Sequence, residues 1–389
     1  MADDQRTERI YRNAVDVIPR DELDRRLRSG ETLRVKLGID PTAPDIHLGF
    51  VVVLKKLREF QDLGHTAVLV VGDYTARVGD PSGRSKTRPV LSPQEIEENT
   101  RTYLDQAYLV LDRERTEVRR NSEWLANLSL ANIIELTRAT TVARILERDD
   151  FSKRFSAGDP ITLTELLYPL MQAYDSVALD AAVELGGTDQ LYNLLMGRRV
   201  MEYYGKEPQC VLTTPLLVGT DGVMKMSKSI GNYIGVTDPP NQMFGKVMSI
   251  PDPLMPDYYA LLLDRPMPEA EPVEQKRDLA RSLVRRFHGE EAAAEAERTF
   301  DAVVSRRVPD DVPEVRLPVD SDEIWIVDLI TLAGFAATNG EARRFIRGGA
   351  VRLDGEVIND EALSLQSAGI MGNVLQVGKR RYARLVSGT

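Results

Sequence analysis

The chain has 389 residues, of which 42% are hydrophobic, and its formal net charge is −10. This length predicts a globular protein of two or three domains, and the acidic balance excludes a protein that binds nucleic acid over its whole surface. A single cysteine excludes an intrachain disulfide, and the three histidines lack zinc-ligand spacing, so we expect no protein-bound metal. The apolar runs are too short for a membrane span and the first ten residues contain no apolar signal region, which predicts a cytoplasmic protein.

The first predicted elements are a strand, a helix and a second strand. Residues 33–39 alternate apolar and polar side chains with the period of a strand, and residues 40–42 interrupt it. From about residue 46, apolar residues recur at helical spacing until Gly64. The continuous apolar run 67–71 is typical of a strand buried on both faces. These elements predict a parallel β-α-β unit with a right-handed crossover.

His47 stands at the start of the predicted helix, within the segment DPTAPDIHLGF at residues 40–50. In parallel sheets, ligands bind outside the carboxyl ends of the strands, where helix N-termini offer unpaired amides. Since Gly49 allows a bulky ligand to come close, a nucleotide phosphate or ribose beside His47 is one interpretation. The other is a histidine that only caps or packs against the helix start, and this stretch alone does not decide between them.

A second polar pattern lies on a predicted helix. Tyr168, Gln172 and Asp175 are spaced four and three residues apart, so they project from one helix face, opposite the apolar residues Leu167, Leu170 and Met171. A face that mixes an aromatic ring, an amide and a carboxylate favours a binding site. An exposed amphipathic helix is the alternative.

A loop with two lysines follows the apolar run 211–218. The segment GTDGVMKMSKSIGN, residues 219–232, begins with an Asp-Gly turn and holds Lys225 and Lys228 beside the hydroxyls of Ser227 and Ser229. Two cations on a hinged loop suit a polyphosphate that must be held and then released. A solvated turn is the alternative for a lysine-rich loop.

The composition changes after about residue 236. A proline-rich stretch gives way to charge-rich helical sequence at 268–304, and the proline and acid cluster at 308–323 predicts a linker. Residues 342–359 predict a basic helix and then a hairpin that turns at Asp354-Gly355. From Gly340 onward there are eight basic and five acidic residues, so the net charge is 8 − 5 = +3. This tail is either an RNA-binding module or a solvated face.

The His-x-Gly segment after the first strand and KMSKS after a later one resemble the class I aminoacyl-tRNA synthetases. GDPSGRSKTRP (79–89), LLYPLMQAYDS (166–176) and GGTDQLYN (186–193) narrow the resemblance to the tyrosyl-tRNA synthetases of bacteria. It extends from about residue 33 to the C-terminus. It implies an α/β fold with a Rossmann-like doubly wound parallel sheet and a dimerisation insertion at 1–236. It also implies a helical domain that contacts the anticodon stem, with its linker, at 237–320, and a small S4-like α+β RNA-binding domain at 321–389.

The activity implied by the resemblance is tyrosine–tRNA ligation. Such an enzyme activates L-tyrosine with ATP, whose phosphates carry Mg²⁺, and charges tRNA(Tyr), and members of the family form homodimers. Two alternatives are a paralogue that activates tyrosine or an analogue without charging tRNA, and an RNA-binding paralogue with weakened catalysis.

The resemblance also assigns site residues. The catalytic set around the leaving phosphates is Thr42, His47, Lys225, Lys228 and Ser229. Further ATP contacts are Asp40, Gly49, Phe50, Gly187, Asp189, Met226, Ser227, Arg84 and Arg88. Tyrosine contacts are Asp80, Tyr168, Gln172, Asp175 and Gln190, with Asp175 accepting a hydrogen bond from the substrate phenol. RNA contacts are Arg343, Arg344, Arg347, Arg352, Lys379, Arg380 and Arg381. Arg84 and Arg88 can equally be surface charges, and Thr188 or Asp189 can be a helix N-cap.

Two positions stand apart from this pattern. The family motif usually ends in a second histidine, or sometimes asparagine, where this chain has Phe50. Losing one polar contact there costs about 1 to 3 kcal/mol. The alternative is that Phe50 extends the apolar helix face of Val53 and Leu57. Lys36 occupies a position where some members have a tyrosine, and it is left unassigned.

Overall fold

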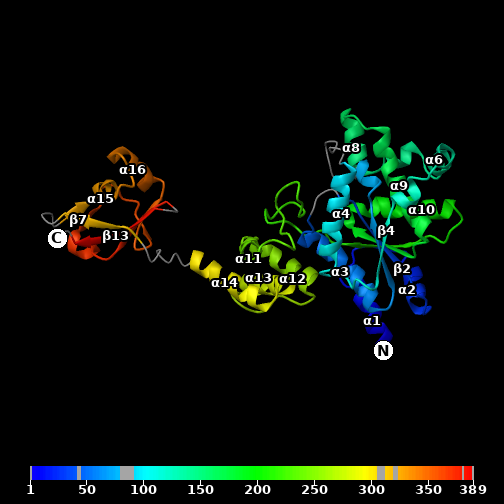
Figure 1. The fold of residues 1–389 in the computed structure, drawn as a ribbon, viewed down its shortest axis with the longest axis horizontal. Coiled ribbons are helices and arrows are strands. Elements are labelled where there is room, and N and C mark those ends of the chain that lie inside the picture. The colour runs from blue at the N-terminus through cyan, green and yellow to red at the C-terminus, as the bar shows by residue number, and fades with distance from the viewer. Residues whose placement is uncertain are drawn as a thin grey trace. The chain divides into compact units, whose positions relative to one another are not determined.

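The computed structural model describes residues 2–41, 45–78, 92–304, 312–318, 323–378 and 381–387. The chain divides into two compact units, Met1–Phe300 and Asp301–Thr389, drawn in Figure 1. In these described ranges, no helix is both long enough and apolar enough to cross a membrane.

The first unit is built on a six-stranded sheet in the order β1-β6-β5-β2-β3-β4. Its strands are β1 (Val17–Ile18), β2 (Arg34–Ile39), β3 (Thr66–Val71), β4 (Thr116–Arg120), β5 (Val183–Gly187) and β6 (Cys210–Thr214). Strands β2 to β6 pair in parallel, and β1 pairs antiparallel with β6. Because the chain moves from β2 to β3 on one side and later to β5 on the other, the strand order reverses at β2. Ligand sites of doubly wound sheets form at such a reversal.

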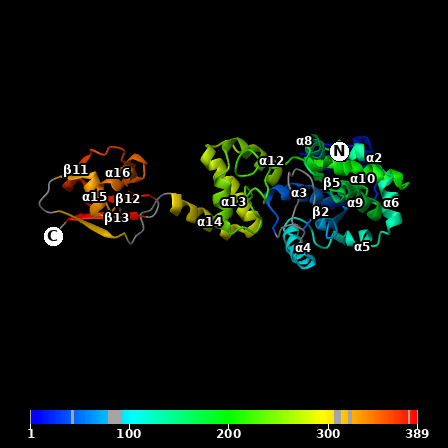
Figure 2. The same ribbon diagram turned by 90° about the horizontal axis from the view of Figure 1, so that it is seen from above.

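Helices cover both faces of this sheet, with α3 (Leu48–Asp62) on one side and α9 (Leu163–Leu179) and α10 (Leu191–Tyr203) on the other (Figures 1 and 2). Alternate residues of β3 point to the two sides: Ala67 and Leu69 share a core with α3, whereas Val68 and Val70 pack with α9. The unbroken apolar run of β3 therefore follows from burial on both faces.

The predicted β-α-β unit is confirmed. β2 and β3 are parallel, with Val35 opposite Ala67. The helix begins at Leu48, two residues later than expected, and ends at Asp62, after which Gly64 adopts a positive φ of 93°. A glycine suits this position because a left-handed backbone has little steric cost without a Cβ.

The remaining helices of the sheet region precede or connect its strands. They are α1 (Ala2–Tyr11), α2 (Arg20–Arg28), α4 (Pro93–Ala107), α5 (Ser122–Leu125), α6 (Leu130–Thr137), α7 (Val142–Ile145) and α8 (Asp149–Ala157), with short 3₁₀ turns at Thr75–Arg77 and Thr188–Gln190. Helices α5 to α8 all lie in the long crossover between β4 and β5.

A helical region follows β6 and packs on the same core as α3. It contains α11 (Pro240–Met248), a 3₁₀ turn at Asp252–Leu254, α12 (Met255–Leu263), α13 (Pro272–His288) and α14 (Glu290–Val304). Val247 of α11 and Leu279 of α13 belong to the same buried cluster as Leu54 of α3. Three prolines of this stretch, Pro240, Pro256 and Pro272, stand in the first turns of α11, α12 and α13, where a missing backbone N–H costs nothing.

The second unit contains a five-stranded sheet in the order β10-β9-β12-β13-β7 and a two-stranded sheet of β11 and β8. Its elements are β7 (Glu314–Leu317), β8 (Glu323–Trp325), α15 (Ile326–Leu332), α16 (Asn339–Arg347), β9 (Val351–Leu353), β10 (Glu356–Val357), β11 (Ser364–Gln366), a 3₁₀ turn at Ser367–Ile370, β12 (Val374–Val377) and β13 (Arg381–Ser387).

One sequence prediction for this unit is confirmed and another is wrong in part. β9 and β10 form the expected hairpin, with Asp354 and Gly355 both at positive φ, as a two-residue hairpin turn requires. The predicted linker 308–323 includes β7, which pairs in parallel with β13. Prolines and acids surround the short alternating segment EVRL of this strand and conceal its strand period.

Candidate active site

A cavity of about 190 Å³ lies at the carboxyl ends of the central strands. Its walls come from segments that are far apart in the sequence, and among its lining residues are Asp40, His47, Phe50, Gly72, Thr75, Tyr103, Asn121, Tyr168, Gln172, Asp175 and Gln190. The structure therefore brings the polar face of α9 together with the segment around His47, as the position of the strand reversal predicts.

The polar face of α9 is inside the protein. Tyr168 is 5% exposed and Asp175 is 4% exposed, so the alternative of an exposed amphipathic helix is wrong. Asp175 accepts hydrogen bonds from Trp124 Nε1 at 2.8 Å and from Asn121 Nδ2 at 3.5 Å. Burial raises the pKa of Asp175 to about 7, although the positive charge of Lys36 opposes that shift.

Asp40 links the two sides of the cavity. It accepts a hydrogen bond from Tyr168 Oη at 2.7 Å and another from Thr75 Oγ1 at 2.7 Å. A Cβ on Gly72 would collide with the Asp40 carboxylate, so only glycine fits after β3. Asp40 was expected beside ATP and Tyr168 beside tyrosine, and their hydrogen bond makes these two predicted subsites adjacent.

His47 is the N-cap residue of α3, but its side chain makes no capping hydrogen bond. Its Nδ1 atom is buried and has no hydrogen-bond partner among the described residues. Burial and the charges of Lys228 and Lys225 lower the pKa of His47 to about 4, so the imidazole is neutral at physiological pH. A neutral ring facing the cavity keeps one N–H donor for a ligand.

The residues after His47 pack tightly against the lysine loop. A Cβ on Gly49 would lie 3.0 Å from His47 Nδ1 and 3.3 Å from Met226 Cβ, so a larger residue would have to displace one of these side chains slightly. The Gly49 amide donates to Met226 Sδ at 3.3 Å. Phe50 is half-buried, lines the cavity and also packs against the main core, so it does extend the apolar helix face.

Backbone pairing brings the lysine loop to the start of α3. Leu48 N donates to Ile234 O at 2.9 Å, and Val236 N donates to Ile46 O at 2.9 Å. The segment directly after KMSKS is thus fixed beside His47, although about 180 residues of sequence separate the two motifs.

The two lysines of the loop have different neighbours. Lys225 forms an ion pair with Asp189. Lys228 Nζ lies 4.9 Å from the centre of the Tyr103 ring and donates to its hydroxyl at 3.3 Å, and burial lowers the pKa of Lys228 to about 8. The Ser227 and Ser229 hydroxyls are 3.0 Å apart. The loop thus presents two cations and two hydroxyls near the cavity.

The turn after β5 places the predicted contacts Asp189 and Gln190. Gly187 N donates to Gln190 Oε1 at 3.1 Å, and a Cβ on Gly187 would lie 2.7 Å from Asp189 Oδ1. The N-cap positions here are Gly187 for the 3₁₀ turn and Gln190 for α10, so the alternative of Thr188 or Asp189 as N-cap is wrong.

Six predicted site residues lie outside the described residues: Thr42, Asp80, Arg84, Arg88, Lys379 and Arg380. Within the described part of the chain, no group of three or more histidine, cysteine or acidic side chains is arranged to hold a metal ion.

The sequence of this chain is similar to known proteins along its whole length. Residues 28–305 match the family model "tRNA synthetases class I (W and Y)", and residues 324–367 match the S4 domain. A tyrosine–tRNA ligase of Thermotoga maritima is 50% identical over 401 residues, which cover 100% of this chain and 99% of that protein. One of Deinococcus radiodurans is 49% identical, over 97% of this chain and 95% of that protein. The chain belongs to the bacterial tyrosyl-tRNA synthetase family.

Solved tyrosyl-tRNA synthetases share its fold. The enzyme from Aeropyrum pernix superposes with a TM-score of 0.62 at 20% identity, covering 79% of this chain and 100% of that one. The enzyme from Archaeoglobus fulgidus, complexed with L-tyrosine, has a TM-score of 0.62 at 24% identity, covering 76% and 99%. Together with the S4 match of residues 324–367, this likeness confirms the predicted α/β fold with a C-terminal S4 domain.

In this member of the tyrosyl-tRNA synthetase family, the predicted RNA contacts are spread over three elements of the second unit. Arg343, Arg344 and Arg347 are exposed on α16, Arg352 is half-buried on β9, and Arg381 is exposed on β13. Arg347 forms an ion pair with Glu361. Arg343 and Arg381 stack over the rings of Trp325 and Phe345 at 5.2 and 4.7 Å.

Sequence reasoning missed several residues of this synthetase site. Asn121 directly follows β4, and a polar residue at a strand's carboxyl end was a signal that could have found it. Trp124, Thr75 and Tyr103 carry no such signal. Asn232 was also missed, although its side chain bonds to Ser227 N at 2.8 Å and to Asp221 Oδ2 at 2.9 Å and so holds the lysine loop.

Proposed function

We propose that this protein activates L-tyrosine with ATP, giving tyrosyl-adenylate and pyrophosphate, and then transfers tyrosine to the 3′-terminal ribose of tRNA(Tyr) with release of AMP. The observation that carries the proposal is the single cavity lined both by Asp175, Tyr168 and Gln172 and by His47. An amino acid bound on α9 has its carboxylate directed to the side where phosphates are held.

Selection of tyrosine is assigned to the buried face of α9. Asp175 accepts a hydrogen bond from the substrate phenol, and Tyr168 and Gln172 bind the substrate ammonium together with Asp80, while Gln190 makes a further contact. Asp175 is buried and already has two neutral donors, which supports this role. Phenylalanine would leave the buried carboxylate without its third partner, and such a loss discriminates strongly between substrates.

Activation needs no general base in this scheme, because the tyrosine carboxylate is already ionised. Its oxygen attacks the α-phosphorus of ATP while the bond from that phosphorus to pyrophosphate breaks. Positioning and charge stabilisation supply the catalysis. Thr42 and the neutral His47 face the leaving phosphates from one side, and Lys225, Lys228 and Ser229 from the other, with Mg²⁺ carried by the nucleotide. Nucleotide contacts are completed by Asp40, Gly49, Phe50, Gly187, Asp189, Met226, Ser227, Arg84 and Arg88.

The second unit is proposed to hold the tRNA backbone through its arginines. Exposed Arg343 and Arg344 suit phosphate contacts, which supply affinity and position rather than sequence readout. Replacing both with alanine should raise the tRNA KM in charging assays and leave pyrophosphate exchange unchanged. An unchanged tRNA KM would remove these two residues from the interface. We also propose a cytoplasmic location, where both ATP and tRNA are available.

A homodimer is proposed through the crossover between β4 and β5. Large apolar side chains are exposed there: Leu130 is 73%, Phe155 65% and Leu163 81% exposed. Apolar surface of this kind on connected helices marks an interaction site, and a second copy is the partner that the family suggests. Light scattering should give twice the chain mass, and Leu163→Asp should lower it. A monomeric mass for the unaltered protein would contradict the proposal.

Tyrosine-dependent exchange of labelled pyrophosphate into ATP, without tRNA, tests the activation step. We expect robust exchange, and Phe50→His should raise kcat/KM for ATP by about tenfold if a polar contact to the nucleotide is restored. A charging assay with tRNA(Tyr) then tests transfer. A folded protein with no exchange would overturn the proposal, and adenylate formation with no charged tRNA would restrict the enzyme to activation.

A further inference from the structure

Lys36 and Glu184 form a buried ion pair directly behind the cavity. They stand opposite each other on the parallel strands β2 and β5, their Nζ and Oε1 atoms are 2.9 Å apart, and each side chain is 1% exposed. Removing two charges from water is expensive, and apolar residues of similar volume commonly give an equally stable core. A stability role alone is therefore a weak explanation for this pair.

The contacts of the pair concentrate on one turn of α9. Lys36 Nζ donates to Ser176 Oγ at 2.6 Å and to Gln172 O at 3.1 Å. Glu184 accepts from Lys36, from Gln172 Nε2 at 3.2 Å, from Ser176 Oγ at 3.3 Å and from Gln209 Nε2. This turn carries Asp175, so both members of the pair lie against the proposed tyrosine-binding face.

The pair also fixes the orientation of the Gln172 amide. Its Nε2 is bound to Glu184, and its Oε1 accepts from Asn193 Nδ2 at 3.1 Å. Asn193 is oriented in turn by Arg148 Nη1 at 3.2 Å. Since an amide oxygen has two acceptor positions, Oε1 keeps one for a substrate ammonium. An amide free to flip would offer its NH₂ group to the ammonium half of the time.

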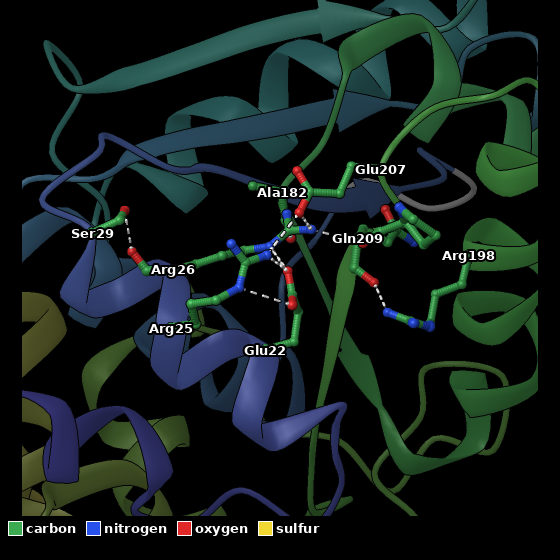
Figure 3. Close-up of polar contacts among 9 residues, drawn as sticks. Glu22, Arg25, Arg26, Ser29, Ala182, Arg198, Glu207 and Gln209 are labelled. Atoms are coloured by element: carbon green, nitrogen blue, oxygen red, sulfur yellow. Dashed lines mark hydrogen bonds and ion pairs between the residues drawn. The ribbon is translucent and has the colours of Figure 1, made fainter.

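On the side away from Lys36, Glu184 lies against Gln209, which directly precedes β6, and against α10. A Cβ on Gly197 of α10 would collide with Gln209 Nε2 and lie 3.1 Å from Glu184 Oε2, so the close approach of α10 requires glycine. Figure 3 shows contacts to the chain just before each strand: Arg26 donates to Ala182 O at 3.1 Å before β5, and Arg198 donates to Gln209 O before β6. Arg26 also donates to Pro208 O at 3.0 Å. The pair therefore sits in a rigid frame.

We propose that the Lys36–Glu184 pair is the positioning element for tyrosine selection: it orients the Gln172 amide and places a positive charge against the turn of α9 that carries Asp175. This inference rests on the proposed function of α9. Asp175 is otherwise faced by neutral donors, Trp124 and Asn121, by the negative charge of Glu184, and across the cavity by Asp40 and Tyr168, which are bonded to each other.

The positive charge of Lys36 opposes the effect of burial on the pKa of Asp175. Burial raises the pKa of Asp175 to about 7, and Lys36 makes the largest opposing contribution. Removing the ammonium moves the pKa of Asp175 further upward, so less of the carboxylate is present at neutral pH. Leaving a protonated Asp175 without the phenol hydroxyl costs less free energy than leaving a buried carboxylate without it. The preference for tyrosine over phenylalanine therefore falls.

The test is Lys36→Met in tyrosine-dependent pyrophosphate exchange, measured from about pH 6 to about pH 9. We expect kcat/KM for tyrosine to fall by about tenfold or more, mainly through KM. The acid limb of its pH profile should move to higher pH and the preference for tyrosine over phenylalanine should decrease, while KM for ATP stays the same. An unchanged acid limb and an unchanged preference in a folded Lys36→Met protein would overturn the inference.

A second variant separates positioning from folding. Lys36→Met combined with Glu184→Gln leaves no unpaired buried charge, yet it does not restore the positive charge beside Asp175. A purely structural pair predicts that this double variant recovers the normal acid limb, and that result would also overturn the inference. The double variant also removes the negative charge of Glu184, which raises the pKa of Asp175, but this contribution is smaller than that of Lys36. Our inference therefore predicts that the acid limb stays above its normal pH.

Lys55→Met is the matched control. Lys55 is another buried lysine, with a side chain that is 8% exposed; it pairs with Asp264 at 2.9 Å and donates to Leu261 O at 2.8 Å, away from the cavity. The Lys55→Met substitution should lower the melting temperature without changing the KM for tyrosine or the acid limb of the pH profile. If the unaltered protein shows no tyrosine-dependent exchange at all, the proposed function fails rather than this inference.

Discussion

The α9 side of the cavity and the KMSKS side are built differently. On α9, Tyr168 and Asp175 are almost fully buried, and the Asp175 carboxylate is held by two side chains from another segment. On the loop, the Lys225 side chain is 38% exposed and its contact is an ion pair with Asp189. One side is fixed before a ligand arrives, and the other can exchange its partners.

This difference matches two physical demands. Telling tyrosine from phenylalanine requires a preorganised, desolvated acceptor, because the penalty for leaving it unpaired is what rejects the wrong substrate. Holding a polyphosphate requires strong charges, but pyrophosphate must leave after the reaction, so the cations need freedom to open. We therefore expect substitutions on α9 to act on tyrosine KM and specificity, and substitutions on the loop to act on ATP KM and kcat.

The largest effect is expected for Asp175→Asn. The side chain keeps its shape, but its oxygen cannot accept from Trp124, Asn121 and a phenol together, and the charge is lost. We expect kcat/KM for tyrosine to fall by about a hundredfold in pyrophosphate exchange. The value for phenylalanine should stay the same or rise.

Asp180→Asn provides the matched control at the end of the same helix. Asp180 is exposed, has a positive φ that asparagine tolerates, and pairs with Lys206. Its substitution should leave tyrosine kinetics unaltered. Equal losses from the two variants would mean that the effect of Asp175→Asn comes from a disturbed helix and not from recognition.

The α9 side and the loop side should also respond differently to pH, and this effect is smaller than that of Asp175→Asn. The pKa of Asp175 is raised to about 7, so its carboxylate is lost as pH falls through about 7, and kcat/KM for tyrosine should fall with it. The pKa of Lys228 is lowered to about 8, so its charge is lost as pH rises through about 8, and kcat at saturating tyrosine should fall there. Each limb should approach about tenfold per pH unit.

Lys228→Arg assigns the limbs to their residues. A guanidinium keeps its charge over this range, so the basic limb should move to higher pH while the acid limb stays in place. A basic limb that does not move would show that a group other than Lys228 controls it, and a shift of both limbs would remove the proposed division between the two sides.

The sequence alone predicts the features of the two sides that depend on local periodicity. Alternation at 33–39 and helical spacing after residue 46 located β2 and α3 to within two residues. The four-and-three spacing of Tyr168, Gln172 and Asp175 placed them on one face of α9. These signals are local because a helix or a strand fixes the direction of each side chain relative to its neighbours.

The supporting residues depend on tertiary contacts and were not predictable in this way. Trp124 reaches Asp175 from α5, and Tyr103 reaches Lys228 from α4. Lys36 was left without a role, because nothing in the alternation of β2 shows that Glu184 stands opposite it on β5, about 150 residues later. Strand order, not strand sequence, creates that pair.

The smallest effect is expected for Asn232→Ala, which tests how the loop is held. The Asn232 side chain is 4% exposed, accepts from Ser227 N at 2.8 Å and donates to Asp221 at 2.9 Å and to Lys225 O at 3.2 Å. Without it the loop samples more conformations, so ATP KM should rise by about three- to tenfold at unchanged tyrosine KM. Asn241→Ala, at an exposed asparagine in the first turn of α11, should change neither constant. A rise in tyrosine KM in Asn232→Ala would instead mean that the loop and α9 are mechanically coupled, because no bond of Asn232 reaches α9 among the described residues.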